Sequence, residues 1–160
     1  ARAGVKGASV GNYALFAGGR AGSFCTTVDA YNASLTRTTA TALSSEENRS
    51  AAATVGNHAI FVGSTASADI YDASLTKTSA AILSTARTGL AATTVGDYAI
   101  FSGGGVADFC DASLTRSSIG TSMTGYDMGA ATIGDYALFA GGHSGEKSDT
   151  AYDSVEVYTA

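Results

Sequence analysis

The chain has 160 residues, of which 45% are hydrophobic and only 14% are charged, with fourteen acidic against nine basic side chains and a net charge of −5. An acidic chain without a cluster of lysines and arginines is a poor match for phosphate backbones, so we expect no nucleic-acid partner. The apolar runs are short and broken by glycine, far below the ~18 residues of a membrane-spanning helix, so we expect no membrane insertion.

One phrase occurs four times. It begins as Val10-Gly-Asn-Tyr-Ala-Leu-Phe-Ala-Gly-Gly19 and returns from Val55, Val95 and Ile133, so that successive copies start 45, 40 and 38 residues apart. Such spacings are typical of solenoids, propellers or arrays. A second phrase follows each copy, in the first unit Val28-Asp-Ala-Tyr-Asn-Ala-Ser-Leu-Thr-Arg37. We treat the chain as a single domain, 1–160, with repeat units at approximately 1–44, 45–84, 85–122 and 123–160.

The third unit illustrates the predicted strands. A β-rich run, Leu90–Val95, is followed by the pair Gly96-Asp97 and then by Tyr98–Ser102. Two such runs separated by Gly-Asn or Gly-Asp predict a hairpin, because glycine at the first turn position supplies the positive φ of a type II′ turn. The other units have the same pair, beginning at Gly11, Gly56 and Gly134.

A third strand is predicted at Ala107–Cys110, then a turn at Asp111, and a fourth strand near 115–122. The second strands are apolar on both alternating faces, which is typical of strands covered on both sides. Four short antiparallel strands in about 40 residues describe a propeller blade. We therefore predict an all-β propeller of four blades, three complete and one lacking its outer strand, which forms a whole ring or half of a larger one.

This pattern resembles the kelch repeat, in which Gly-Gly ends the second strand of each blade and a tyrosine lies in the third. The matches are Gly18-Gly19, Gly103-Gly104 and Gly141-Gly142, the partial copy Gly63-Ser64, and Tyr31, Tyr71 and Tyr158, with Cys110 departing. Kelch units usually carry a tryptophan about seven residues after that tyrosine, whereas this chain has none. We expect Leu35, Leu75 and Leu114 to fill part of the missing volume.

Counting strands by unit leaves the first and last blades with open faces. We expect these faces to bear Leu15, Phe16, Leu138 and Phe139 and to drive association, because burying a large apolar side chain is favourable by roughly 1.5–3 kcal/mol. The prediction is a homodimer that closes an eight-bladed ring; a closed four-bladed ring is the alternative.

Loop length points to a binding surface. From the Gly-Gly position to the third-strand acid the spacing is 10, 5, 4 and 14 residues, whereas the rest of the unit is nearly constant. A constant scaffold with one variable class of loop is typical of binding proteins, and many kelch propellers bind partners on that rim. The candidate contact residues are Arg20, Phe24, Glu46, Arg49, Arg87, Tyr126, Asp127, His143 and Lys147.

The predicted function is therefore non-catalytic binding of a protein or glycan. A propeller enzyme of sugar epimerase or oxidase type and a purely architectural, self-assembling fragment remain as alternatives. The composition favours an extracellular, cell-surface or virion-surface protein of bacterial or phage type, and ordinary solvated loop residues are the competing explanation for the rim.

We find no pattern for catalysis, a metal or a cofactor. His58 and His143 are isolated in different units, which makes a poor metal site. The repeated acids Asp29, Asp69, Asp108 and Glu156 lie on strands, and we expect pairing with Arg37, Lys77 and Arg116 or simple solvation.

Arg2 and Arg87 occupy equivalent positions, where hydrogen bonds to the backbone of a neighbouring blade are favoured over ligand contact. Two cysteines make no disulfide framework; we expect Cys110 to be a buried free thiol.

Overall fold

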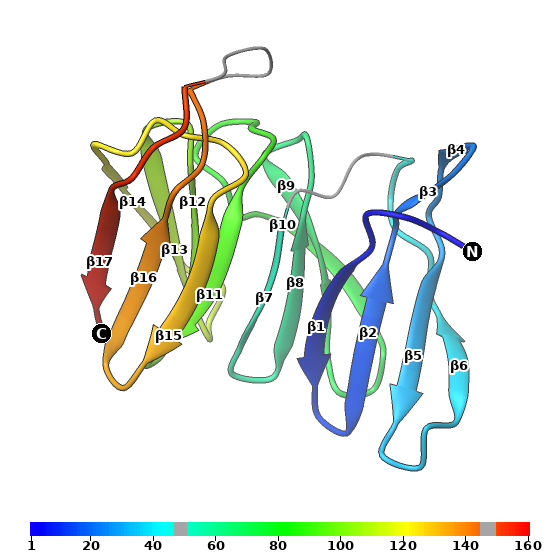
Figure 1. Ribbon diagram of the computed structural model, residues 1–160. Helices are drawn as coiled ribbons and strands as arrows, with labels where there is room; N and C mark the ends of the chain where they lie inside the picture. The colour runs from blue at the N-terminus through cyan, green and yellow to red at the C-terminus, as the bar shows by residue number, and fades with distance from the viewer. Residues whose placement is uncertain (47–50, 145–149) are drawn as a thin grey trace.

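The computed structural model describes residues 1–46, 51–144 and 150–160. Within those segments the chain is all-β and has no helix. Four antiparallel sheets follow one another along the chain, one from each sequence unit (Figure 1). Three sheets have four strands and the last has three, so the predicted division into four blade-like units, with no outer strand in the last, is confirmed.

The strands have the following bounds. Sheet one contains β1 (Lys6–Val10), β2 (Tyr13–Ala17), β5 (Val28–Asn32) and β6 (Arg37–Ala40), with a small hairpin, β3 (Arg20–Ala21) and β4 (Ser23–Phe24), beside it. Sheet two contains β7 (Ala51–Val55), β8 (His58–Val62), β9 (Ser67–Tyr71) and β10 (Lys77–Ala81). Sheet three contains β11 (Ala91–Val95), β12 (Tyr98–Gly103), β13 (Val106–Asp111) and β14 (Arg116–Gly120). Sheet four contains β15 (Gly129–Ile133), β16 (Tyr136–Ala140) and β17 (Val155–Thr159).

The predicted hairpin turns are present in all four sheets. In sheet one Val10 pairs with Tyr13 across a two-residue turn, and Gly11 has a φ of 53°. The glycines at 56, 96 and 134 have φ values of 52°, 52° and 54°. The Asn or Asp that follows each glycine keeps an ordinary φ, as a type II′ turn requires.

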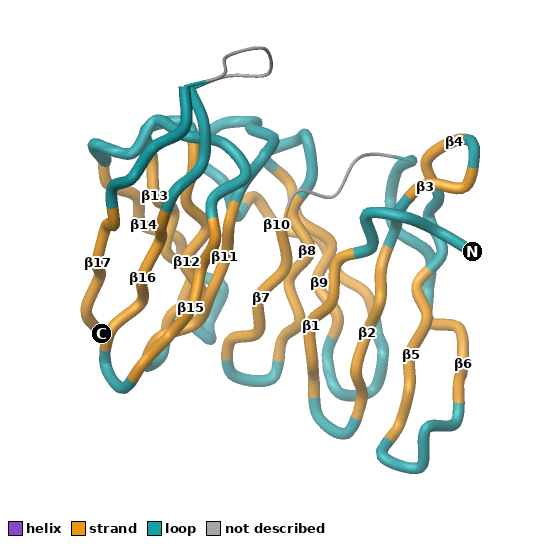
Figure 2. Tube along the Cα trace, in the orientation of Figure 1, coloured by secondary structure: helices purple, strands orange, loops and turns teal. Residues whose placement is uncertain are grey.

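The sheets are arranged as a propeller-like fan. The first strands of successive sheets (β1, β7, β11 and β15) contact one another in chain order. They border an open groove of about 230 Å³ whose lining comes from all four sheets. Sheets one and four extend to opposite sides of the view and sheets two and three lie behind them (Figures 1 and 2).

The core consists of three clusters, each between neighbouring sheets. Between sheets one and two, Leu15 and Val28 pack with Phe61 and Tyr71. The same positions of the later units form the cluster between sheets two and three and the cluster between sheets three and four. Each inner sheet thus gives one apolar face to each neighbour, which explains why its second strand is apolar on both faces.

Part of the prediction about which residues lie on the open faces is wrong, because side chains alternate along a strand. Leu15 and Phe139 are fully buried, because their side chains point inward to sheets two and three. Their chain neighbours point the opposite way: Phe16 is 43% exposed and Leu138 is partly exposed. The prediction was right for Phe16 and Leu138 and wrong for Leu15 and Phe139, because successive side chains of a strand lie on opposite faces.

The repeated turn leucines behave in two ways. Leu35, Leu75 and Leu114 all have a positive φ, of 58°, 64° and 62°, a region that side chains other than glycine seldom adopt. Leu75 and Leu114 pack against the clusters between sheets, as expected. Leu35 is 80% exposed, so the expectation that it fills core volume is wrong for the described chain. The difference arises because none of the described residues forms a sheet against that face of sheet one.

Truncation of Phe61 tests the packing between sheets one and two. We expect Phe61→Ala to lower the free energy of unfolding by about 3–5 kcal/mol, because it leaves a cavity among buried side chains. Phe24→Ala, on the exposed hairpin, should cost about 0.5 kcal/mol or less. Urea unfolding followed by circular dichroism measures both variants, and equal losses would contradict the assignment of Phe61 to the core.

Candidate functional site

A buried aspartate lies in the third strand of sheets two and three. Asp108 is 0% exposed, and its carboxylate accepts a hydrogen bond from Arg87 Nη2 at 2.6 Å and another from the Ser84 backbone N–H at 3.0 Å. Arg116 Nη1 lies 3.5 Å from the same carboxylate. Ser84 belongs to the connection from sheet two to sheet three, so Asp108 fastens that connection to the following sheet.

Sheet two repeats the arrangement at Asp69. The Ser44 backbone N–H donates to the carboxylate at 2.9 Å, and Lys77 Nζ lies 3.5 Å away. The predicted pairing of the repeated aspartates with Arg37, Lys77 and Arg116 is therefore confirmed. The serine donors were missed, although the Leu-Ser pairs at 43–44 and 83–84 recur at equivalent positions and carry the signal.

The two equivalent arginines bind within their own sheets. Arg2 Nη1 donates to the backbone carbonyls of Gly18 at 2.6 Å and Thr27 at 2.7 Å, and Arg2 Nη2 forms an ion pair with Asp29. Backbone hydrogen bonding was expected, but to a neighbouring sheet. Arg87 likewise pairs with the third-strand aspartate, Asp108, but it donates to the side chains of Ser84 and Thr85 where Arg2 donates to backbone carbonyls.

Asp29 of sheet one is more accessible than its counterparts. Arg37 donates to it through Nε at 2.9 Å and Nη2 at 2.6 Å, and Arg2 binds the other carboxylate oxygen. Partial burial by itself raises the pKa of Asp29, but the hydrogen bond from Arg37 and the charges of both guanidinium groups outweigh it. The net effect is a pKa below the ordinary 3.8.

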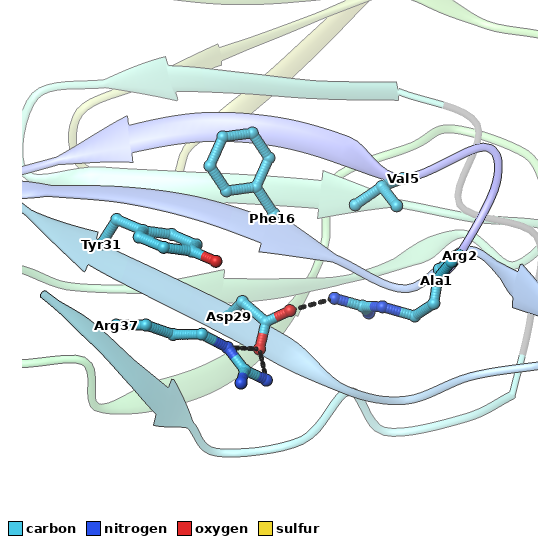
Figure 3. Close-up of a pocket in the computed structure, with 7 residues that line it drawn as sticks. All are labelled: Ala1, Arg2, Val5, Phe16, Asp29, Tyr31 and Arg37. Atoms are coloured by element: carbon cyan, nitrogen blue, oxygen red, sulfur yellow. Dashed lines mark hydrogen bonds and ion pairs between the residues drawn. The ribbon is translucent and has the colours of Figure 1, made fainter. Parts of the chain in front are cut away.

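These groups border an open hollow of about 570 Å³ on the uncovered face of sheet one. Figure 3 shows Phe16 and Tyr31 side by side on the sheet, with Asp29 between the two arginines and Val5 near the chain start. The rings of Phe16 and Tyr31 meet edge to face, with centroids 5.9 Å apart. The hollow thus joins an aromatic floor to a paired carboxylate.

The loop rim is the side of the fan that carries the connections between second and third strands and between sheets. The described parts of the former connections comprise residues 18–27, 63–66, 104–105, 141–144 and 150–154, and they lie at the top of Figures 1 and 2. Arg20 and Phe24 lie on its β3–β4 hairpin, where the guanidinium carbon of Arg20 is 5.8 Å from the centroid of the Phe24 ring. Glu46 lies in the connection from sheet one to sheet two.

Three of the predicted rim residues form a cluster beside sheet four. Tyr126 and His143 exchange backbone hydrogen bonds of 3.0 and 3.1 Å, and their rings lie 6.4 Å apart. His143 Nε2 is 3.3 Å from the Asp127 carboxylate. Asp127 has a φ of 54°, and its backbone N–H is anchored on the Gly89 carbonyl at 2.8 Å.

The remaining predicted rim residues are placed as follows. The Arg87 side chain is only 8% exposed in its pair with Asp108, so it supports the rim from below. Arg49 and Lys147 lie outside the described residues. The structure therefore brings Tyr126, Asp127 and His143 together and leaves Arg20 and Phe24 at a separate place on the rim.

The described residues offer few other reactive groups. No three His, Cys, Asp or Glu side chains among them lie close enough to hold a metal ion, and none of their segments forms a helix long and apolar enough to cross a bilayer. Cys110 is a buried free thiol, as expected, and Cys25 is also free. Burial and the neighbouring Asp111 raise the pKa of Cys110 to about 11, so this thiol is unreactive near neutral pH.

Comparison with protein-family models found no match for this chain, and comparison with curated proteins found none either.

Removal of Arg87 tests how much the buried ion pair with Asp108 contributes to stability. We expect Arg87→Met to lower the free energy of unfolding by about 3 kcal/mol, because Asp108 would keep a buried charge with only the more distant Arg116 beside it. Arg37→Met is the matched control: Arg37 is exposed and Asp29 retains Arg2, so the loss should be much smaller. Urea titrations at one protein concentration compare the two variants, and similar losses would contradict the buried role of Asp108.

The depressed pKa of Asp29 predicts a defined pH dependence. Since the folded-state pKa lies below 3.8, the ionised carboxylate stabilises the fold above that pH, and this contribution is lost as the pH falls through the folded-state value. The stability difference between the unsubstituted chain and Asp29→Asn should therefore be constant above about pH 5 and shrink below it. Urea unfolding at a series of pH values measures it; a difference that does not change in acid would refute the prediction.

Proposed function

We propose that this chain is a non-catalytic binding module, a kelch-like propeller unit that presents its loop rim to a protein or a glycan. The observation that carries the proposal is the contrast between the two sides of the fan. One side is built from turns that recur along the chain, and the other differs in every repeat.

The constant side consists of two kinds of turn. Each first hairpin uses the glycine turn described above, and the third strands of sheets one, two and three end in a turn closed by a side chain of that turn. In sheet one the Asn32 side-chain oxygen accepts from the backbone N–H groups of Ser34 at 3.0 Å and Thr36 at 2.9 Å. Asp72 and Asp111 do the same in the next two sheets. Such closed turns leave few backbone groups free for a ligand.

The loop rim has the opposite character. Its strand connections run from two residues, 104–105, to fourteen, 141–154, and they carry aromatic and charged side chains. The Arg20–Phe24 pair and the cluster of Tyr126, Asp127 and His143 provide flat rings beside hydrogen-bonding groups. Aromatic and arginine side chains are enriched at the centres of binding interfaces. Beneath the rim, the carboxylates of Asp69 and Asp108 hold the sheet connections, so the loops can differ without disturbing the sheets.

A second candidate is a purely architectural role, in which the chain exists to assemble with copies of itself. The apolar faces left uncovered on sheets one and four favour it. The two roles are compatible, because the faces used for assembly are distinct from the loop rim.

Substitution on the two sides distinguishes a binding rim from solvated loops. Protein and glycan arrays first provide a ligand, whose affinity is then measured by calorimetry. We expect Phe24→Ala or Tyr126→Ala to weaken binding about 10-fold or more, since such anchors typically contribute more than 1 kcal/mol. Asp97→Asn, on a constant turn, is the control and should leave the affinity unchanged. If both rim variants bind as tightly as the unsubstituted chain while remaining folded, the rim is not the binding surface.

A further inference from the structure

The uncovered faces of sheets one and four are the two halves of an interface that the chain already builds three times. In each internal interface, one sheet contributes aliphatic side chains from its first three strands, such as Val10, Leu15 and Val28 of sheet one. The next sheet contributes an edge-to-face aromatic pair in two of the three interfaces, Phe61 with Tyr71 at 5.9 Å and Phe139 with Tyr158 at 5.7 Å between ring centroids. In the interface between sheets two and three, Phe101 stands beside Cys110 instead.

Sheet four repeats the aliphatic half and exposes it. Ile133, Leu138 and Val155 occupy the positions of Val10, Leu15 and Val28 in the repeat. The alternation in β16 and β17 places Leu138 opposite Val157, on the face turned away from sheet three. Ile133 is 70% exposed and Val155 is 55% exposed, whereas their counterparts in sheet one are buried.

Sheet one repeats the aromatic half and exposes it. The Phe16–Tyr31 pair has the same edge-to-face geometry and the same 5.9 Å spacing as Phe61–Tyr71. Leu35 is the counterpart of Leu75, which packs against the cluster between sheets one and two. Leu35 adopts the same left-handed backbone, but its side chain lies in solvent. The aromatic half of the interface is therefore already formed before any partner binds.

The turns give an independent marker of the same contact. A Cβ placed on Gly11 would lie 2.6 Å from the Ala73 Cβ of the next sheet, and one on Gly56 would lie 2.8 Å from that of Ala112. Gly96 approaches Ala160 of sheet four in the same way. Gly134, the fourth copy, meets no atom of the described residues within 4 Å. Its expected partner by repeat position is Ala33, which is exposed.

The shape of the fan indicates what covers these faces. The first strands contact one another in chain order, from β1 through β7 and β11 to β15, and sheets one and four extend to opposite sides of Figure 1. Their uncovered faces therefore belong to the two ends of the row of sheets. A second copy of the chain offers four more sheets, with the complementary face at each junction.

We propose that the open face of sheet four binds the open face of sheet one in a second copy, and that the reciprocal contact closes a ring of eight sheets about a twofold axis. Ile133, Leu138, Val155 and Val157 of one copy pack on Phe16, Tyr31 and Leu35 of the other, and Gly134 approaches Ala33. This assembly is independent of what the loop rim binds.

The mass in solution is the first test. Sedimentation equilibrium between about 1 and 50 µM should give twice the chain mass of 15.9 kDa. A particle of one chain mass throughout this range would overturn the proposal in favour of a closed or open single chain. Masses that grow with concentration beyond two chains would overturn it in favour of an open array.

Single substitutions then locate the contact. We expect Leu35→Asp and Val157→Asp each to raise the dimer dissociation constant about 100-fold or more, because each places a charge in an apolar interface. Ile119→Asp is the matched control: Ile119 is also an exposed aliphatic residue, but it lies on β14 outside both open faces, and this variant should remain dimeric. Circular dichroism and urea unfolding confirm that each variant is folded.

Mixing two monomeric variants tests whether two different faces meet. Leu35→Asp mixed with Val157→Asp should form a mixed dimer, because one of its two junctions then contains only unsubstituted faces. Leu35→Asp mixed with Phe16→Asp should not, since both junctions carry a substituted sheet one. If Leu35→Asp abolishes association while Val157→Asp leaves it intact, the dimer joins identical faces and the proposed ring is wrong.

Discussion

Every sheet of this chain is apolar on both faces, and this constraint governs the rest of the structure. A sheet with two apolar faces needs a neighbour on each side, because each large side chain left in water forgoes roughly 1.5–3 kcal/mol of burial. Sheets two and three satisfy the requirement with their chain neighbours, and their Phe61 and Phe101 are fully buried. Sheets one and four satisfy it on one side only. The fan shape and the exposed Phe16 and Ile133 follow from the same property.

Close stacking also explains the composition. The turns of one sheet approach those of the next so closely that a side chain at Gly11 would collide with the Cβ of Ala73. The aspartate in the third strand adds hydrogen bonds and ion pairs to this apolar stack. In sheets two and three it accepts a hydrogen bond from a backbone N–H of the preceding connection and pairs with a basic side chain of its own sheet. A buried carboxylate requires such partners. These hydrogen bonds and ion pairs therefore fix where each connection enters the next sheet.

The hydrogen bonds and ion pairs of Asp69 and Asp108 lie just beneath the loop rim. The contacts that stabilise the sheets are therefore separate from the loops that vary in length. None of the residues of the clusters between sheets lies in 104–105 or in the described parts of 141–154. On the opposite side, the turns closed by Asn32 and its counterparts cannot change in length in the same way, because these turns set the pairing of adjacent strands. This difference between the two sides is the physical basis for the proposal that the loop rim binds a partner.

Sequence alone determined the repeat, the strands, the glycine turns and the pairing of the acids with basic residues, because these depend on contacts within about 40 residues and on backbone preferences that recur four times. Tertiary structure decided which copy of a repeated residue is buried. Leu15 and Phe139 point inward while Phe16 and Leu138 do not, and Leu35 lies in solvent while Leu75 is packed, although the local sequence is nearly the same. Burial here depends on whether another sheet lies against that face, and the repeat itself does not record how many sheets surround the groove.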